Sequence, residues 1–242
     1  MTSNQNLISL QLKTSDNFNK NLNRLIKHIK KTDGNSVILA PELYLTGYAY
    51  DRFDEAYNIT KKAIKELSKL SKNKIIALTL ITKKKKQFYN TLHIFYQGKI
   101  VHTQSKYHLF VLNDEKKYFS QGDIEDIKIV NIGGIKIAAM ICFELRFIDL
   151  WKKTQGADLI LIPAMWGKPR KTHFEALTKS LAIVNQSYLI ASNSSNTDMA
   201  KSSCIVSPFG DVTSDDNSKV ILSSLDPKQI KKMRRYMQVG IK

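Results

Sequence analysis

The chain has 242 residues, of which 43% are hydrophobic and 24% charged, a balance typical of one globular domain with a sizeable core. This composition excludes a chain that is disordered throughout, a collagen-like or coiled-coil protein, and a disulfide scaffold. The 38 Lys and Arg against 21 Asp and Glu give a net charge of +17, but the basic residues are scattered and accompany no RNA-binding or zinc-finger pattern. Nucleic-acid binding is therefore not expected as the main function.

The cellular location is predicted from features that the sequence lacks. No segment reaches the roughly 18–20 apolar residues needed to cross a bilayer, and the N-terminal residues show no secretory-signal pattern. The two cysteines, Cys142 and Cys204, are too few for a disulfide framework or a four-cysteine metal site. We therefore expect a cytoplasmic protein that does not bind a membrane.

The first half of the chain alternates between strand and helix patterns. Residues 7–12 predict a strand, and Asp16 is expected to cap a helix whose apolar stripe runs from Phe18 to Ile29. A strand at 37–40 completes a βαβ opening, which favours a layered α/β fold. The pattern then predicts a helix at 54–71 and strands at 75–82, 88–96 and 99–104.

The second half of the chain alternates again after a polar loop. Thr172 and Glu175 form a capping-box pattern, which predicts a helix that extends to about residue 186. No linker or internal repeat is evident, so we expect a single domain over 1–225 and a polar tail over 226–242, a candidate for an oligomer interface. The loop covers 107–126, and the expected strands are 127–132, 135–141, 158–162, 188–192, 203–207 and 219–225.

Cys142 is the first residue whose position indicates chemistry. It follows an apolar strand and precedes a short helix, and catalytic groups in α/β folds gather where strands end and helices begin. A helix N-terminus also favours the thiolate, by several tenths to about 1 kcal/mol. The alternative is an inert small hydrophobic side chain, and this interpretation is kept for Cys204 inside its strand-like run.

A cysteine nucleophile needs a base, and none of the five histidines has the sequence context of a Cys–His protease. Glu42 follows an apolar strand, where a carboxylate is costly unless it is paired or functional. Lys106 closes another strand. Taken singly, each of these two side chains is more often a solvated surface group.

Together, Glu42, Lys106 and Cys142 lie in three separated motifs, and with them the sequence resembles the nitrilase superfamily of carbon–nitrogen hydrolases. The resemblance covers residues 7–225 and implies a Glu–Lys–Cys catalytic triad at these positions. A further catalytic glutamate is implied, and Glu115 is its best match. The motifs are Pro41-Glu42-Leu43-Tyr44-Leu45-Thr46-Gly47-Tyr48, Lys106-Tyr107-His108-Leu109-Phe110, Asn113-Asp114-Glu115-Lys116-Lys117-Tyr118-Phe119 and Cys142-Phe143-Glu144-Leu145-Arg146-Phe147.

The resemblance implies a four-layer α–β–β–α sandwich that assembles into homodimers or larger homo-oligomers, and it implies no metal or organic cofactor. It also implies that Glu42 takes the proton of Cys142, that a thioester forms on the sulfur, and that water then releases the acid. Lys106 and the backbone N–H of Phe143 are expected to stabilise the tetrahedral oxyanion, where one such donor contributes roughly 3–4 kcal/mol.

Three features resemble the omega-amidase-like branch of the family, whose members hydrolyse the terminal amide of small dicarboxylic acid monoamides such as 2-oxoglutaramate. They are the Lys-x-His-Leu-Phe motif, the Ala-Met-Trp-Gly-Lys-Pro-Arg segment at 164–170, and the short connection after the cysteine motif. Arg170 is expected to bind the distal carboxylate, since a guanidinium pairs bidentately with one. The further expected substrate-binding residues are Tyr48, Phe143 and Trp166. The alternatives are a solvated Arg170 and a core Trp166.

Arg146 is a second candidate for the distal carboxylate, against the alternative of a structural ion pair beneath the site. Some positions depart from the family pattern: Phe-Glu follows Cys142 where Tyr-Asp is common, Ile148 replaces a common Pro, and Val184 replaces a common Glu. These departures concern the shape of the pocket more than the chemistry.

The leading hypothesis is a cysteine-dependent hydrolase of small-molecule amides. N-carbamoyl-amine hydrolysis is the runner-up, because the same triad serves both reactions, and no feature is specific for nitriles. A subunit that supplies ammonia to a separate partner chain is a third reading. A non-catalytic basic binding protein on the same scaffold is the alternative from a different class, and the intact Glu42, Lys106 and Cys142 argue against it.

Overall fold

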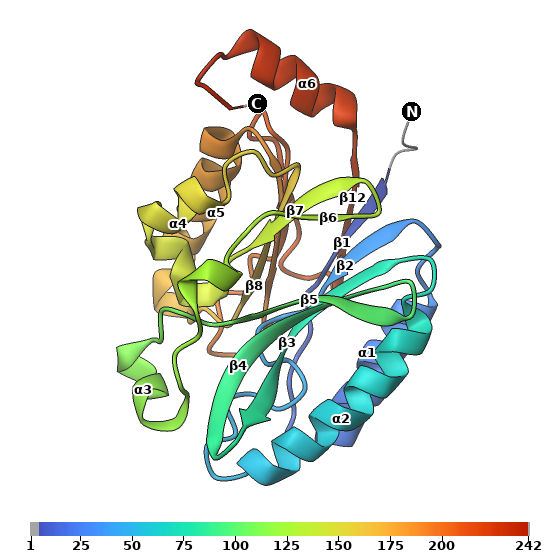
Figure 1. Cartoon of the computed structure of the whole chain (residues 1–242), viewed down its shortest axis with the longest axis vertical. Helices are drawn as coiled ribbons and strands as arrows, with labels where there is room; N and C mark the ends of the chain where they lie inside the picture. The colour runs from blue at the N-terminus through green and yellow to red at the C-terminus, as the bar shows by residue number, and fades with distance from the viewer. Residues whose placement is uncertain (1–4, 242) are drawn as a thin grey trace.

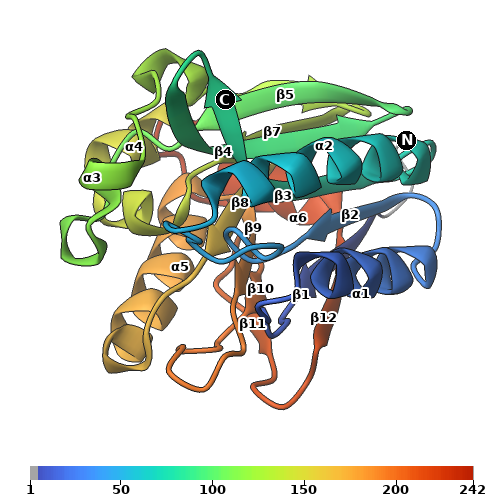
Figure 2. The same ribbon diagram turned by 90° about the horizontal axis from the view of Figure 1, so that it is seen from below.

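Two six-stranded sheets pack face to face in the computed structural model, which describes residues 5–241 (Figure 1). Helices α1 (Phe18–Lys30) and α2 (Phe53–Leu70) cover the outer face of the first sheet (Figure 2). Helices α4 (Ile148–Lys153) and α5 (Lys171–Asn185) cover the outer face of the second. The chain is thus a single domain with the four-layer α–β–β–α sandwich that the sequence predicts.

Both sheets are mixed, and every strand expected from the sequence is present. The first sheet contains β1 (Gln5–Leu10), β2 (Ser36–Leu39), β3 (Ile75–Lys84), β4 (Gln87–Tyr96), β5 (Lys99–Ser105) and β12 (Val220–Leu225). The second contains β6 (Val130–Ile132), β7 (Ile135–Ala139), β8 (Leu159–Ala164), β9 (Tyr188–Asn193), β10 (Cys204–Val206) and β11 (Val212–Ser214). Their orders are β12-β1-β2-β3-β4-β5 and β11-β10-β9-β8-β7-β6. Neighbours β1-β2-β3 and β7-β8-β9 run parallel, and the four helices form the crossovers that parallel pairs need.

Helix α1 illustrates why the sequence forms these layers. Its buried apolar side chains recur at helical spacing and pack against the first sheet, while its Lys residues, Asn19 and Asn23 face solvent. The helix begins at Phe18, so its cap is Asn17, whose Oδ1 accepts a hydrogen bond from Lys20 N at 2.9 Å. The expected cap at Asp16 is wrong by one residue. The apolar stripe consists of Phe18, Leu22, Leu25 and Ile29.

The expected capping box of α5 is also absent. The helix begins at Lys171, one residue before Thr172, and has no side-chain cap. Glu175 does not reach back to the start of the helix but accepts a hydrogen bond from Ser202 Oγ at 2.7 Å. The Thr-x-x-Glu pattern is therefore not a cap in this chain.

Some elements are not predicted by the sequence. Residues 107–126, expected as a loop, contain the 3-10 helix η1 (Val111–Asn113), the one-turn helix α3 (Glu115–Tyr118) and the 3-10 helix η2 (Ile124–Asp126). Strand β11 is also unexpected, because its three residues are exposed and show no alternation. These pieces are too short for a periodic pattern.

Residues 226–242, expected as a polar tail, begin with helix α6 (Pro227–Tyr236). Asp226 caps the helix by accepting a hydrogen bond from Lys228 N at 2.9 Å, and Ile230 is buried in the core. A role for this segment at an oligomer interface stays a prediction. Among the residues that the structure describes, no helix is long and apolar enough to span a membrane.

The two sheets meet where their parallel strands end. Glu42, three residues beyond β2, donates its backbone N–H to the carbonyl of Ala164, the last residue of β8, at 3.2 Å. Loops that follow the carboxyl ends of parallel strands are where α/β folds build their sites. This contact therefore draws the loops of both sheets together at one end of the sandwich.

Candidate active site

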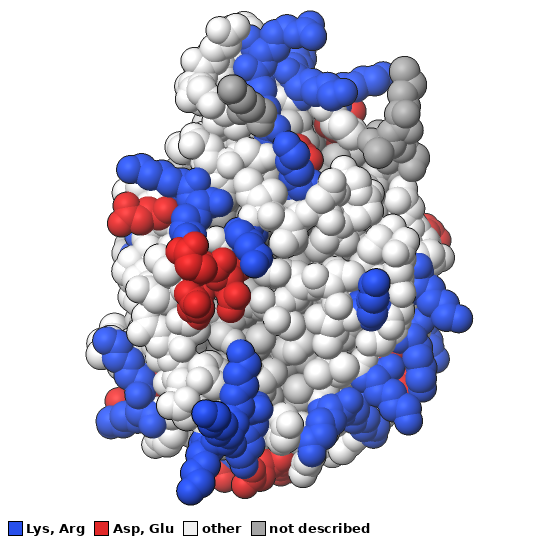
Figure 3. Space-filling model, in the orientation of Figure 1, with Lys and Arg blue, Asp and Glu red and all other residues white. Residues whose placement is uncertain are grey.

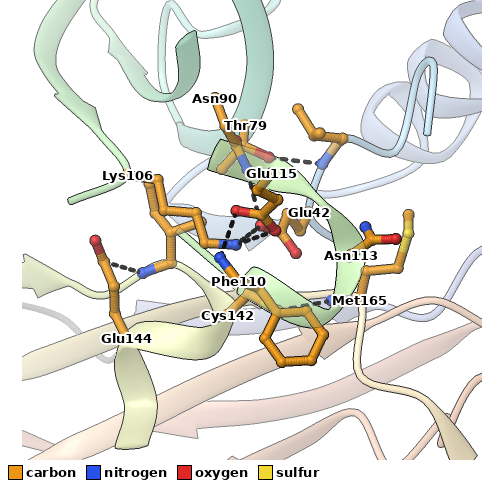
Figure 4. Close-up of polar contacts among 12 residues, drawn as sticks. Glu42, Thr79, Asn90, Lys106, Phe110, Asn113, Glu115, Cys142, Glu144 and Met165 are labelled. Carbon is orange, nitrogen blue, oxygen red and sulfur yellow. Dashed lines mark hydrogen bonds and ion pairs between the residues drawn. The ribbon is translucent and has the colours of Figure 1, made fainter. Parts of the chain in front are cut away.

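The four residues expected to do chemistry converge at this end of the sandwich (Figure 4). Lys106 follows β5, Glu115 opens α3, and Cys142 opens the 3-10 helix η3 (Cys142–Arg146) after β7. Together with Glu42 they come from four separate segments. The side chains of Glu42, Lys106 and Glu115 are fully buried, and Cys142 is 6% exposed.

Lys106 lies between the two glutamates. Its ammonium is 2.8 Å from Glu42 Oε1 and 2.8 Å from Glu115 Oε1. Burial alone would lower the pKa of Lys106, but the negative charges of Glu42 and Glu115 outweigh it and hold that pKa above its ordinary value. The lysine is therefore charged at neutral pH and balances carboxylates that would otherwise be buried unpaired.

Tyr48 and Asn90 hold the carboxylates in place. The Tyr48 hydroxyl lies 2.8 Å from Glu115 Oε1 and 3.1 Å from Glu42 Oε2, and burial raises its pKa well above the ordinary value, so the hydroxyl keeps its proton. Asn90 Nδ2 donates to Glu42 Oε1 at 2.8 Å, and the backbone carbonyl of Asn90 accepts a hydrogen bond from the backbone N–H of Lys106 at 2.8 Å. Sequence reasoning missed Asn90, whose only signal is an amide within the buried stretch of β4.

Glu115 differs from an ordinary surface glutamate. Its pKa is raised above the ordinary value, because burial and the charge of Glu42 outweigh the opposing effect of Lys106. Its other oxygen, Oε2, accepts a hydrogen bond from Phe110 N at 3.1 Å. The carboxyl group is thus held from two sides and aimed at the ammonium, as Figure 4 shows.

Cys142 is held in a conformation that L-residues rarely adopt. Its φ is 52°, in the left-handed region, and its Sγ accepts a hydrogen bond from Met165 N at 3.5 Å. Burial raises the pKa of the thiol well above its ordinary value, the charge of Glu42 and a hydrogen bond to Glu42 add to this, and Lys106 opposes it. Any contribution of the helix N-terminus to the thiolate is therefore outweighed by burial.

A cavity of about 420 Å³ opens onto Cys142. Apolar side chains form most of its wall, and two arginines and one aspartate add charge. Of the expected substrate-binding residues, Tyr48, Phe143, Trp166 and Arg170 all line it. The other lining residues are Phe110, Leu112, Asn113, Cys142, Arg146, Met165, Gly167, Pro169, Asp198 and Met199.

The two arginines of the cavity are held by aromatic rings. The Arg146 guanidinium lies 4.6 Å from the Trp166 ring centroid, and that of Arg170 lies 5.3 Å from the Phe110 ring centroid. Within residues 5–241 neither guanidinium forms an ion pair with a carboxylate. The alternative of a structural ion pair for Arg146 is therefore wrong.

Trp166 combines the two roles that the sequence leaves open. Its ring lines the cavity, yet it is only 4% exposed and packs against Phe174 with ring centroids 5.4 Å apart. The residue is thus both a wall of the cavity and a part of the core. Among residues 5–241, no group of three or more His, Cys, Asp and Glu side chains is placed to hold a metal ion.

Comparisons with known proteins bear on this site. The family model described as carbon-nitrogen hydrolase matches residues 7–235. The chain is 30% identical over 240 residues to the 2-oxoglutaramate amidase of Bacillus subtilis (strain 168), covering 94% of this chain and 91% of that protein. It is 29% identical over 180 residues to the omega-amidase YafV of Escherichia coli (strain K12), covering 72% of this chain and 67% of that protein.

The fold has solved counterparts. The crystal structure of Saccharomyces cerevisiae Nit3, described as a member of branch 10 of the nitrilase superfamily, matches with a TM-score of 0.85. The match covers 99% of this chain and 96% of Nit3 at 22% sequence identity, so it shows a shared fold.

The two cysteines are expected to differ in reactivity. Iodoacetamide should modify Cys142 faster than Cys204, because the charge of Lys106 and the hydrogen bond from Met165 N favour the thiolate of Cys142, whereas the charge of Glu175 disfavours that of Cys204, whose pKa burial raises to about 12. The rate at Cys142 should still be rising at pH 9, because burial raises the pKa of this thiol well above its ordinary range. Peptide mass spectrometry across a pH series measures both, with Cys204→Ser as control. A plateau below about pH 8 would instead reveal a thiolate stabilised by Lys106.

Proposed function

The chain belongs to the carbon–nitrogen hydrolase family, and we propose that it cleaves a small linear amide to an acid and ammonia through a thioester on Cys142. The observation that carries this proposal is the buried contact of Lys106 with Glu42 and Glu115 beside a cysteine that opens onto a cavity. A neutral thiol needs a base at the moment of attack, and Glu42 is the carboxylate whose charge acts on this thiol.

In the first half of the reaction, Cys142 Sγ attacks the amide carbon while Glu42 takes the thiol proton. The ammonium of Lys106 and the backbone N–H of Phe143 stabilise the negative oxygen of the tetrahedral intermediate, and one such donor contributes roughly 3–4 kcal/mol. Glu42 then gives its proton to the leaving nitrogen, the C–N bond breaks, and ammonia departs.

In the second half, water replaces ammonia. Glu42 takes a proton from the water as its oxygen attacks the thioester carbon, and Lys106 again stabilises the oxyanion. The C–S bond breaks, the thiol regains its proton, and the acid is released. Glu115 keeps Lys106 oriented through both halves, which its 2.8 Å contact with the ammonium supports.

The substrate proposed is the monoamide of a small dicarboxylic acid, as for an omega-amidase. Its amide would lie at Cys142 and its carboxylate at Arg170, whose guanidinium lines the cavity without a carboxylate partner among residues 5–241. Arg146 offers a second cation in the same cavity. The names of the Bacillus subtilis and Escherichia coli relatives support this substrate class.

The alternative of a basic binding protein finds less support. On the face shown in Figure 3, Lys and Arg are spread from α6 to the opposite end of the molecule, with acidic side chains among them. Basic side chains follow the lower right edge, where α1 and α2 lie, but the middle of that face is mostly uncharged, so no basic stripe crosses it. Work in the cytoplasm and assembly into a homodimer or larger homo-oligomer stay predictions.

Replacing Cys142 by Ala is expected to lower turnover by roughly a thousandfold or more, because no thioester can form. The measurement is ammonia release from succinamate, 2-oxoglutaramate, neutral amides, N-carbamoyl amines and nitriles. Thermal unfolding checks that the variant is folded, and Cys204→Ser serves as the matched control. Release that persists in Cys142→Ala contradicts the mechanism, and release from N-carbamoyl amines alone would favour the runner-up reaction.

Replacing Arg170 by Met is expected to raise KM for succinamate by roughly 10- to 100-fold, the loss of one charge-assisted contact. A neutral amide of similar length should keep its KM, because it has no carboxylate to bind. Arg235→Met, on the exposed face of α6, is the matched control. An equal rise for both substrates would show that Arg170 shapes the pocket without binding the carboxylate.

A further inference from the structure

Glu144 is a fully buried carboxylate to which the mechanism above assigns no role. It is the third residue of η3 and lies beside the site, as Figure 4 shows. Within residues 5–241 it forms no ion pair, and burial raises its pKa to about 7 in spite of backbone hydrogen bonds and the charge of Lys106. Such a group is costly to bury, so its retention in the core calls for a physical reason.

The two oxygens of Glu144 bind two different segments. Oε2 accepts a hydrogen bond from Ile141 N at 2.6 Å, in the residue directly before Cys142. Oε1 accepts one from Tyr107 N at 2.6 Å, in the residue directly after Lys106. One carboxylate thus joins the nucleophile segment to the lysine segment, at the Lys106–Tyr107 peptide on one side and at the Met140–Ile141 peptide, one residue before Cys142, on the other.

The same two segments also touch through their rings, in contacts that involve side chains and not the backbone. His108 stacks on Phe147 with ring centroids 3.5 Å apart, and Phe110 packs on Phe143 at 4.9 Å. These contacts hold the segments near each other without setting the peptides that carry the thiol and the ammonium. Hydrogen bonds are directional, so the Glu144 carboxylate sets that finer geometry.

Cys142 needs such a constraint. A left-handed φ on a residue other than glycine is strained and persists only where the surroundings over-determine it. The bond from Ile141 N to Glu144 anchors the residue before the strained one, and η3 fixes the chain after it.

We propose that Glu144 is a positioning residue that holds the Cys142 thiol in register with the Lys106 ammonium by bridging Ile141 N and Tyr107 N. It touches neither substrate nor the reacting atoms. Its effect is therefore on the chemical step and not on substrate binding, and the inference rests on the function proposed above.

The variant Glu144→Gln tests this because it keeps the size of the side chain but turns one acceptor oxygen into an NH₂ donor. That donor faces a backbone N–H, so one side of the bridge breaks. The expected result is a fall in kcat of roughly 10- to 100-fold with KM within about threefold, since displacing reacting groups by about 1 Å has costs of this order. The rate of iodoacetamide modification at Cys142 should also change.

The control is Ser187→Ala, which removes a buried hydrogen bond to Ala157 O (2.9 Å) outside the site. It should lower thermal stability and leave kcat unchanged, which separates positioning from mere loss of stability. Glu144→Asp keeps both acceptor oxygens on a side chain one methylene shorter and is expected to show a smaller fall in kcat, again without a change in KM.

The outcomes are distinguishable. A folded Glu144→Gln with kcat within twofold of the parent overturns the inference, and so does a fall in kcat that Ser187→Ala reproduces. If Glu144→Gln does not fold, Glu144→Asp decides, and an unchanged kcat there overturns the inference. Absence of Cys142-dependent turnover in the parent protein would instead contradict the proposed function, and the alkylation rates of the variants would still test the positioning.

Discussion

The site depends on one buried cation. Lys106 lies between Glu42 and Glu115, and without its ammonium two carboxylates from distant segments would lie side by side, unhydrated and repelling each other. Removing one partner of such a buried set typically costs roughly 3–5 kcal/mol, because a charge is left uncompensated. The hydroxyl of Tyr48 and the amide of Asn90 complete the arrangement and fix the direction of each carboxylate.

The sandwich explains why these groups meet. Parallel strands of both sheets end on the same side, and the Glu42 peptide is bonded to the end of β8, so loops from both sheets are drawn over one small volume. There the Cys142 thiol, the proposed nucleophile, lies at a strained position, and burial raises its pKa well above the ordinary range. Attack on an amide would then depend on transfer of its proton to Glu42, within a geometry that the surrounding hydrogen bonds maintain.

The sequence predicts the layers and the four convergent residues because both leave local signals. Strand and helix periods alternate along the chain, and Glu42, Lys106, Glu115 and Cys142 each lie in a recognisable motif. Asn90 gives no such signal, since one amide in a strand looks the same whether or not a carboxylate lies across from it. The prediction also misses two secondary-structure elements for a similar reason. Helix α6 buries one apolar residue, Ile230, and strand β11 buries none, so neither shows a periodic apolar pattern.

The central claim is that an acyl group is carried on Cys142, and the most direct test is to observe it. The protein is mixed with succinamate, quenched in acid within the turnover time, and the mass of the intact chain and of the peptide containing Cys142 is measured. The account predicts an added succinyl group on Cys142 that disappears on alkaline hydroxylamine treatment, as a thioester does. Ammonia release with no adduct at any quench time, together with full activity in Cys142→Ala, would contradict it.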